Sequence, residues 1–140
     1  MQINFEVPGV PVAWTVYTKR GPPPPQFTHM KEYQERIYRA ALQQIGHRKE
    51  FPLTGPISLT ITFIMPYPKG IPKRPQNRLK WLQSHYPKSP DLTNLLKACE
   101  DALHKKVGII QDDSQTVTAS VSKAYGEIPT TIIQIEETSK

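Results

Sequence analysis

The sequence has little cysteine, no long apolar run and no signal segment. Its single cysteine, Cys99, excludes an internal disulfide and is typical of a reducing compartment. Cys99 falls on the apolar side of a helical pattern, so we expect a buried thiol. No apolar segment approaches the roughly 20 residues that a membrane-spanning helix needs, and the N-terminus lacks the basic and apolar regions of a signal peptide. We therefore expect a cytoplasmic protein without a membrane partner.

Several cofactor and nucleophile signatures are also missing. The chain has no glycine-rich phosphate loop, no dinucleotide-binding fingerprint and no serine–histidine–acid set. The four histidines, His29, His47, His85 and His104, do not have the spacing of zinc ligands and are expected at the surface or in loops. We therefore expect no small-molecule cofactor.

The overall composition indicates one folded, basic domain. The 140 residues are 37% hydrophobic and 21% charged, which suits a single globular domain covering 1–140. The formal net charge of +6 favours a polyanionic partner. Fifteen prolines gather mainly in two stretches, 22–25 and 66–90, and indicate loops there.

Alternation and helical periodicity predict the order strand, helix, strand, long loop, helix, strand, strand. The predicted strands are 3–7, 57–65, 117–121 and 131–135, and the predicted helices are 31–45 and 93–104. Residues 10–29 are expected to form a loop with a polyproline stretch, and 125–129 a turn. This order predicts an α+β fold: a small mixed sheet of about four strands with two main helices packed on one face.

The proline-rich segment 66–90 is strongly basic. It contains no acidic residue, and a short helix is expected near 77–83. Tyr67, Trp81 and Tyr86 lie between its cations, which offers both phosphate contacts and stacking surfaces. The segment therefore predicts DNA binding, with a solvated loop as the alternative. Its predicted DNA-binding residues are Lys69, Lys73, Arg74, Arg78, Lys80 and Lys88.

Acidic residues and one lysine gather around the predicted helix 93–104. Asp91 precedes the helix, while Asp112 and Asp113 precede the following strand. Two or three carboxylates are typical ligands of Mg²⁺, and a nearby lysine adds a fixed positive charge or a proton donor. Asp91 and Asp113 can converge only if the helix packs across that strand, and the apolar stripe of the helix predicts that packing. Asn94, Lys97 and Asp101 share one face of the helix by their spacing.

Each of these residues also has a purely structural interpretation. Asp91 is a candidate helix N-cap, and Asp112-Asp113 is a candidate turn before a strand. Lys97 and Asp101 are spaced as a surface ion pair worth only about 0.3–0.5 kcal/mol. Spacing alone therefore makes a metal site plausible without deciding it.

The stretch PDLTNLLKACEDAL, followed by IIQDDSQTV, resembles the signature of the RusA family of Holliday junction resolvases of bacteria and their phages. That family shows Pro-Asp-x-Asp-Asn-Leu-x-Lys, then Asp-Ala-Leu, and later Asp-Asp-x-Gln-Val. The specific match covers about thirty residues. Weaker agreement includes a first strand ending in Pro-Gly and a second strand ending in Met-Pro.

The resemblance implies an endonuclease that binds four-way junction DNA as a homodimer and nicks two strands symmetrically in DNA recombination and repair. It implies Mg²⁺ as the cofactor, with Mn²⁺ as a substitute. By position, Asp91 and Asp113 match the family's metal-binding aspartates, Lys97 its essential lysine and Asn94 its helix-start asparagine. The expected site is thus Asp91, Asp113 and Lys97.

One position departs from the family pattern, because Thr93 stands where the family has its second aspartate. A hydroxyl does not replace the charge of a carboxylate, although it can hold a metal-bound water. Three outcomes follow: Asp91 and Asp113 hold the ion with more waters, Asp112 or Asp101 joins them, or the chain binds junctions and cuts them poorly. We favour an altered but active site.

Two other functions compete with a junction nuclease. A catalytically weak or silent nucleic-acid-binding module would explain Thr93. A structural adaptor that binds protein is a third hypothesis, for which the affinity for DNA would not fall with rising salt.

Overall fold

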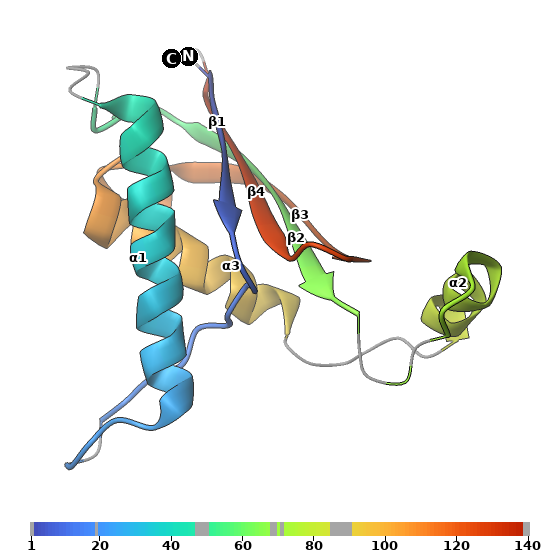
Figure 1. The fold of residues 1–140 in the computed structure, drawn as a ribbon. Helices are drawn as coiled ribbons and strands as arrows, with labels where there is room; N and C mark the ends of the chain where they lie inside the picture. The colour runs from blue at the N-terminus through green and yellow to red at the C-terminus, as the bar shows by residue number, and fades with distance from the viewer. Residues whose placement is uncertain are drawn as a thin grey trace.

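The computed structural model describes residues 2–18, 20–46, 51–67, 70, 72–84 and 91–138, without the side chains of 81–84, 105–107 and 113. Its sheet contains β1 (Gln2–Pro8), β2 (Ile57–Pro66), β3 (Thr116–Gly126) and β4 (Thr130–Glu137), in the order β1-β4-β2-β3 (Figure 1). β2 and β3 are parallel, and the other neighbouring pairs are antiparallel. The predicted α+β fold with a mixed four-stranded sheet is therefore confirmed.

β2 is an interior strand of the sheet, since it pairs with both β3 and β4. Its side chains alternate, with Leu59, Ile61 and Phe63 buried and the intervening residues more exposed. A period of two sets one face of the strand against the core, as the sequence predicts. Its partner β3 is longer than the predicted 117–121 and includes Tyr125, which we expected in a turn. This boundary is wrong because β3 stays paired with β2 as far as Gly126.

The first helix, α1 (Pro25–Ile45), begins six residues earlier than the predicted 31–45. The expectation of a loop through residue 29 is therefore wrong. Pro25 lies in the first turn of the helix, where its fixed φ suits the helix and its missing N–H has no helical partner to lose. The predicted end is confirmed, because Gly46 follows with a φ of 53°.

The predicted helix 93–104 forms α3 (Leu92–Asp101), which leads into a π-helical segment, η1 (Ala102–Val107). Gly108, with a φ of 72°, ends this run. Figure 1 shows α1 and α3 on the same side of the sheet. The buried core lies between these two helices and the sheet. It includes Tyr33 and Ile37 of α1, Leu95 and Cys99 of α3, and Ile133 of β4. The predicted packing of two main helices on one face is confirmed.

The short helix expected near 77–83 is α2 (Pro75–Ser84). In Figure 1 it lies apart from α1 and α3, beyond the end of the sheet toward which β2 points. None of the helices in the described part of the chain is long and apolar enough to cross a membrane.

Candidate functional site

Asp91 stands at the N-cap position of α3, with extended backbone dihedrals of −69° and 132°. Its carbonyl accepts the first helical hydrogen bond, from the Leu95 N–H at 3.0 Å. Its side chain makes no capping hydrogen bond to the first turn, and the residue is exposed. The carboxylate is therefore not used as a cap. It is presented to solvent at the positive end of a helix dipole, where a negative charge is favoured.

Lys97 lies two turns further along α3, and its ammonium sits 3.7 Å from the centroid of the Trp14 ring. Trp14 belongs to the segment that follows β1. Its backbone N–H donates a hydrogen bond of 2.8 Å to the carbonyl of Asn94. The predicted lysine is thus held at a defined place beside the first turns of α3. The contact of Trp14 with Lys97 was not predicted from the sequence.

The carboxylates that precede β3 lie in a tightly bonded loop. Asp112 accepts a 2.6 Å hydrogen bond from the Ser114 hydroxyl. The short 3₁₀ turn η2 (Asp113–Gln115) follows directly and leads into β3. Only the backbone of Asp113 is described, so the direction of its carboxylate stays a prediction.

Gln115 organises this loop and was not singled out in the sequence, although it occupies the glutamine position of the family motif. Its Oε1 accepts hydrogen bonds of 2.7 Å from the backbone N–H groups of Gln111 and Asp112. Its Nε2 donates to the carbonyls of Leu53 and Gly55, at 2.8 and 3.0 Å. One side chain therefore ties the Asp112-Asp113 loop to the segment before β2.

The backbones of Asp91 and Asp113 lie at opposite ends of the helix–strand unit. Figure 1 shows α3 beginning on the side toward which β2 points, and η1 ending on the other side, where β3 begins. The ten residues of α3 and six of η1 span roughly 24 Å at about 1.5 Å per residue. The helix does pack against β3, but it runs antiparallel to that strand, so packing separates the two backbones.

The candidate auxiliary residues on α3 lie at its two different ends. Thr93 is exposed and Asn94 partly buried in the first turn of α3, next to Asp91. Asp101 closes α3, ten residues and about 15 Å along the helix from Asp91. Thr93 and Asn94 are therefore close enough to assist at Asp91, whereas Asp101 lies toward the end of the unit that carries Asp113.

The side chains around α3 are of the chemical types that bind a hard cation, because they offer carboxylate, amide and hydroxyl oxygens. Among the described residues, however, no three His, Cys, Asp or Glu side chains are grouped to hold a metal ion. Asp113 is not counted among these residues, because its side chain is not described. Asp91 alone does not make a metal centre, so a complete site needs further ligands.

The basic segment 66–90 is described in part, and Lys69 and Lys88 lie outside the described residues. Lys73, Arg74 and Lys80 are exposed on or next to α2. Arg78 differs from them, because its guanidinium stacks on the Tyr67 ring at 4.3 Å and lies 3.8 Å from the Glu127 carboxylate. Arg78 therefore connects α2 to the residue that follows β2 and to the β3–β4 turn.

Cys99 lies in a buried polar cluster rather than at a reactive surface. Tyr33 Oη is 3.4 Å from Cys99 Sγ and also bonds the Thr131 hydroxyl. Burial raises the pKa of the Cys99 thiol from 9.0 to about 12 and raises the pKa of Tyr33 well above its usual value. The expected buried thiol is confirmed, and it is not a nucleophile at neutral pH.

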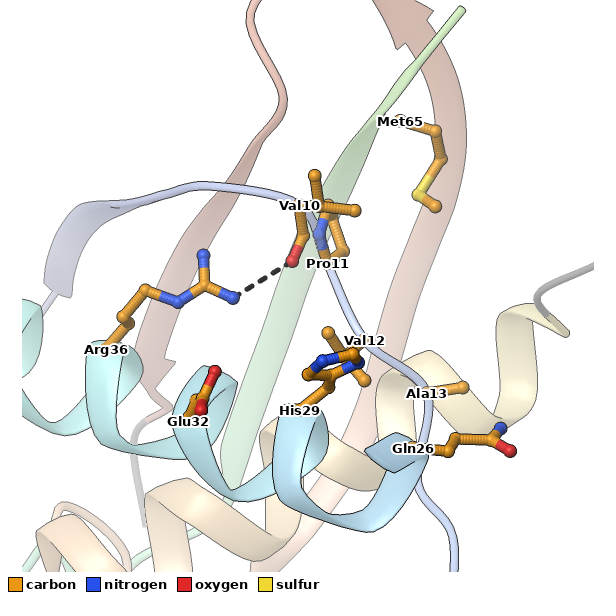
Figure 2. Close-up of a pocket in the computed structure, with 9 residues that line it drawn as sticks. All are labelled: Val10, Pro11, Val12, Ala13, Gln26, His29, Glu32, Arg36 and Met65. Carbon is orange, nitrogen blue, oxygen red and sulfur yellow. Dashed lines mark hydrogen bonds between the residues drawn. The ribbon is translucent and has the colours of Figure 1, made fainter. Parts of the chain in front are cut away.

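A pocket of about 590 Å³ lies between the segment after β1 and the first half of α1 (Figure 2). Its lining is mostly apolar, with His29, Glu32 and Arg36 on α1. Arg36 donates hydrogen bonds to the carbonyls of Pro8 and Val10, at 2.7 and 3.1 Å, so its guanidinium fixes the segment. None of the predicted site residues lines this pocket.

The sequence profile of the family described as endodeoxyribonuclease RusA matches residues 13–136. The chain belongs to the RusA family. At the level of the family it is an endodeoxyribonuclease directed at Holliday junctions. It is also 35% identical over 143 aligned residues to a protein of Bacillus subtilis (strain 168) described as uncharacterized protein YqaN. That match covers 98% of this chain and 97% of YqaN, so the similarity extends through the whole RusA domain.

Proposed function

We propose that this RusA-family chain is a Mg²⁺-dependent endonuclease that resolves four-way DNA junctions by paired nicks, as a homodimer in the cytoplasm. Mn²⁺ is expected to substitute for Mg²⁺. The observation that carries the proposal is the exposed Asp91 carboxylate, which is not used as a helix cap, on the same helix as the ordered Lys97. Recombination and DNA repair are the processes that supply such junctions.

In this proposal Asp91 and Asp113 hold the ion, with Asn94, Thr93, Asp112 and Asp101 as candidate auxiliary groups. The bound ion would supply an acidified water and a counter-charge for the phosphate oxygens. Hydrolysis would form a bond from a water oxygen to phosphorus, release a proton of that water to solvent, and break the bond from phosphorus to the 3′-oxygen. The Lys97 ammonium offsets the charge that grows on the phosphate or gives a proton to the leaving 3′-oxygen.

The antiparallel course of α3 and β3 adds a requirement to this mechanism. Two carboxylates that share a Mg²⁺ have oxygens only about 4 Å apart, since each lies about 2.1 Å from the ion. In one chain Asp91 precedes the start of the α3–η1 run, which is roughly 24 Å long at about 1.5 Å per residue, and Asp113 comes after its far end. We therefore propose that each site combines Asp91 of one subunit with Asp113 of the partner subunit.

The nuclease activity is tested with a synthetic four-way junction and a linear duplex of the same sequence, each with Mg²⁺ or EDTA. We expect metal-dependent nicking of the junction alone, lost in Asp91→Asn and in Asp113→Asn. Junction binding without metal-dependent nicking, unchanged by Asp113→Asn, would support the silent binding module that Thr93 suggests. Binding that does not weaken with salt would support the protein-binding adaptor.

The shared site is tested by mixing Asp91→Asn chains with Asp113→Asn chains after refolding together. If each site takes one aspartate from each subunit, a mixed dimer has one site with both native aspartates and one with neither. We expect the mixture to regain single nicks, while each variant alone is inactive. If both aspartates of a site came from one chain, every site in the mixture would stay defective and no nicking would return.

A further inference from the structure

The segment between β1 and α1 is hydrogen-bonded near Trp14 to both α3 and α1. The Trp14 N–H donates to the carbonyl of Asn94 on α3 at 2.8 Å. The next residue, Thr15, donates its N–H to the sulfur of Met30 on α1 at 3.2 Å. The indole of Trp14 packs partly buried against the core. Its ring is therefore held in place by backbone contacts on both sides.

The Lys97 ammonium lies 3.7 Å from the centroid of that ring. A lysine side chain has four rotatable bonds, and an exposed lysine normally samples many rotamers. The negative face of an indole attracts an ammonium and favours the rotamers that place it over the ring. Lys31 lies over the Phe27 ring on α1 at the longer distance of 5.4 Å, and neither residue belongs to the proposed site. That pair offers a matched control.

We propose that Trp14 is a positioning residue for Lys97. Its indole confines the ammonium to the side of α3 that also carries Asn94, one turn from the helix start where Asp91 stands. The entropy of ordering the lysine is then lost on folding and not in the transition state. This proposal rests on the proposed function, because it assigns the purpose of the contact to phosphodiester cleavage by the same site.

The first experiment compares Trp14→Leu, Trp14→Phe and the control Phe27→Leu in junction nicking with Mg²⁺. We expect Trp14→Leu to lower kcat about fivefold with KM for the junction little changed. Trp14→Phe, which keeps an aromatic face, should recover much of the loss, and Phe27→Leu should match the wild type. An unchanged kcat in Trp14→Leu would overturn the proposal. So would a raised KM alone, which would make Trp14 a DNA contact.

A second comparison separates positioning from a general effect on folding. In a Lys97→Met background, Trp14→Leu should produce no further loss of kcat, because the group that Trp14 positions is absent. If Trp14→Leu lowered kcat by the same factor in both backgrounds, the two residues would act independently and the proposal would fail.

NMR provides a readout that does not depend on activity. Protons of the Lys97 side chain above an indole face are shifted upfield by the ring current, and we expect this shift in the wild type and its loss in Trp14→Leu. Ordinary lysine shifts in the wild type would overturn the placement of Lys97. If the wild type showed the upfield shift but no nicking of any junction, the contact would stand and the proposed function would fail.

Discussion

At the scale of single residues, two side chains decide how the RusA motif is used in this chain. Thr93 stands where the family has its second aspartate, one position from the start of α3. Gln115 occupies the glutamine position of the same motif and bonds the loop that contains Asp112 and Asp113. Thr93 therefore lowers the negative charge of the proposed site relative to the family pattern, and Gln115 sets the shape of the loop that contains Asp112 and Asp113.

Restoring the family aspartate should strengthen the proposed site. Thr93→Asp adds a second carboxylate near Asp91, which should lower the Mg²⁺ concentration needed for half-maximal nicking. We expect the nicking rate to rise by about tenfold, the factor that about 1.4 kcal/mol of added transition-state stabilisation produces. Thr93→Asn, which is similar in size but neutral, is the control. Equal rates in Thr93→Asp and Thr93→Asn would show that charge at position 93 does not limit the reaction.

Removing the Gln115 side chain should loosen the loop before β3. Gln115→Ala loses four hydrogen bonds to backbone groups, so we expect the free energy of unfolding to fall by about 2 kcal/mol. Urea denaturation measures this difference, with Gln43→Ala on the exposed surface of α1 as the control. Hydrogen exchange should also become faster at Gln111 and Asp112. A loss no larger than that of the control would contradict the bonding role.

At the scale of elements, α2 presents the basic part of the chain away from α1 and α3. Lys73, Arg74 and Lys80 are exposed there, whereas Arg78 is engaged with Tyr67 and Glu127. The six cations that the sequence groups together are therefore not equivalent. Arg78 contacts Tyr67 and Glu127, and the candidates for contacts with phosphate are the cations whose side chains are exposed.

We expect the exposed cations of α2 to contribute to the salt dependence of DNA binding. The triple variant Lys73→Ala, Arg74→Ala and Lys80→Ala should reduce the slope of log affinity against log salt by up to about 3, near one per phosphate contact. Fluorescence anisotropy with a labelled junction at several salt concentrations measures the slope. Arg39→Ala on α1, where Arg39 pairs with Glu35 at 3.6 Å, is the control. Identical slopes would exclude these phosphate contacts.

At the scale of the whole molecule, the core contains a titrating pair that links folding to alkaline pH. The Cys99 thiol, whose pKa burial raises to about 12, and the Tyr33 hydroxyl, whose pKa burial also raises, are in contact. The unfolded chain releases the thiol proton near pH 9.0, while the folded chain retains it. The stabilisation is therefore complete below pH 9 and is lost as pH rises toward about 12.

We expect the free energy of unfolding to fall above pH 9, by at most about 1.4 kcal/mol per pH unit for each such group. Cys99→Ala should reduce the slope of the free energy of unfolding against pH between pH 9 and 10, where the tyrosine hydroxyls of the unfolded chain are still mostly protonated. The cavity left by the substitution lowers stability at every pH. Urea denaturation at several pH values compares the slopes. Equal slopes in the wild type and Cys99→Ala would contradict a buried, protonated thiol.

The sequence determined much of the architecture by itself. Alternation in β2, the apolar stripe of α3 and the glycines at 46 and 108 are local signals, because backbone geometry and burial of one face act within a few residues. The motif from Asp91 to Gln115 was enough for the family resemblance, which the RusA profile supports over residues 13–136. The start of α1 was missed, since prolines signal loops and helix starts alike.

Only the tertiary structure decided how the motif is arranged in space. Sequence spacing does not reveal that α3 runs antiparallel to β3, and that direction places the backbones of Asp91 and Asp113 at opposite ends of the helix–strand unit that α3, η1 and β3 form. Nor does it reveal that Trp14, 83 positions before Lys97, lies under its ammonium. Such contacts join distant segments, and their geometry follows from the packing of the whole core and not from any local pattern.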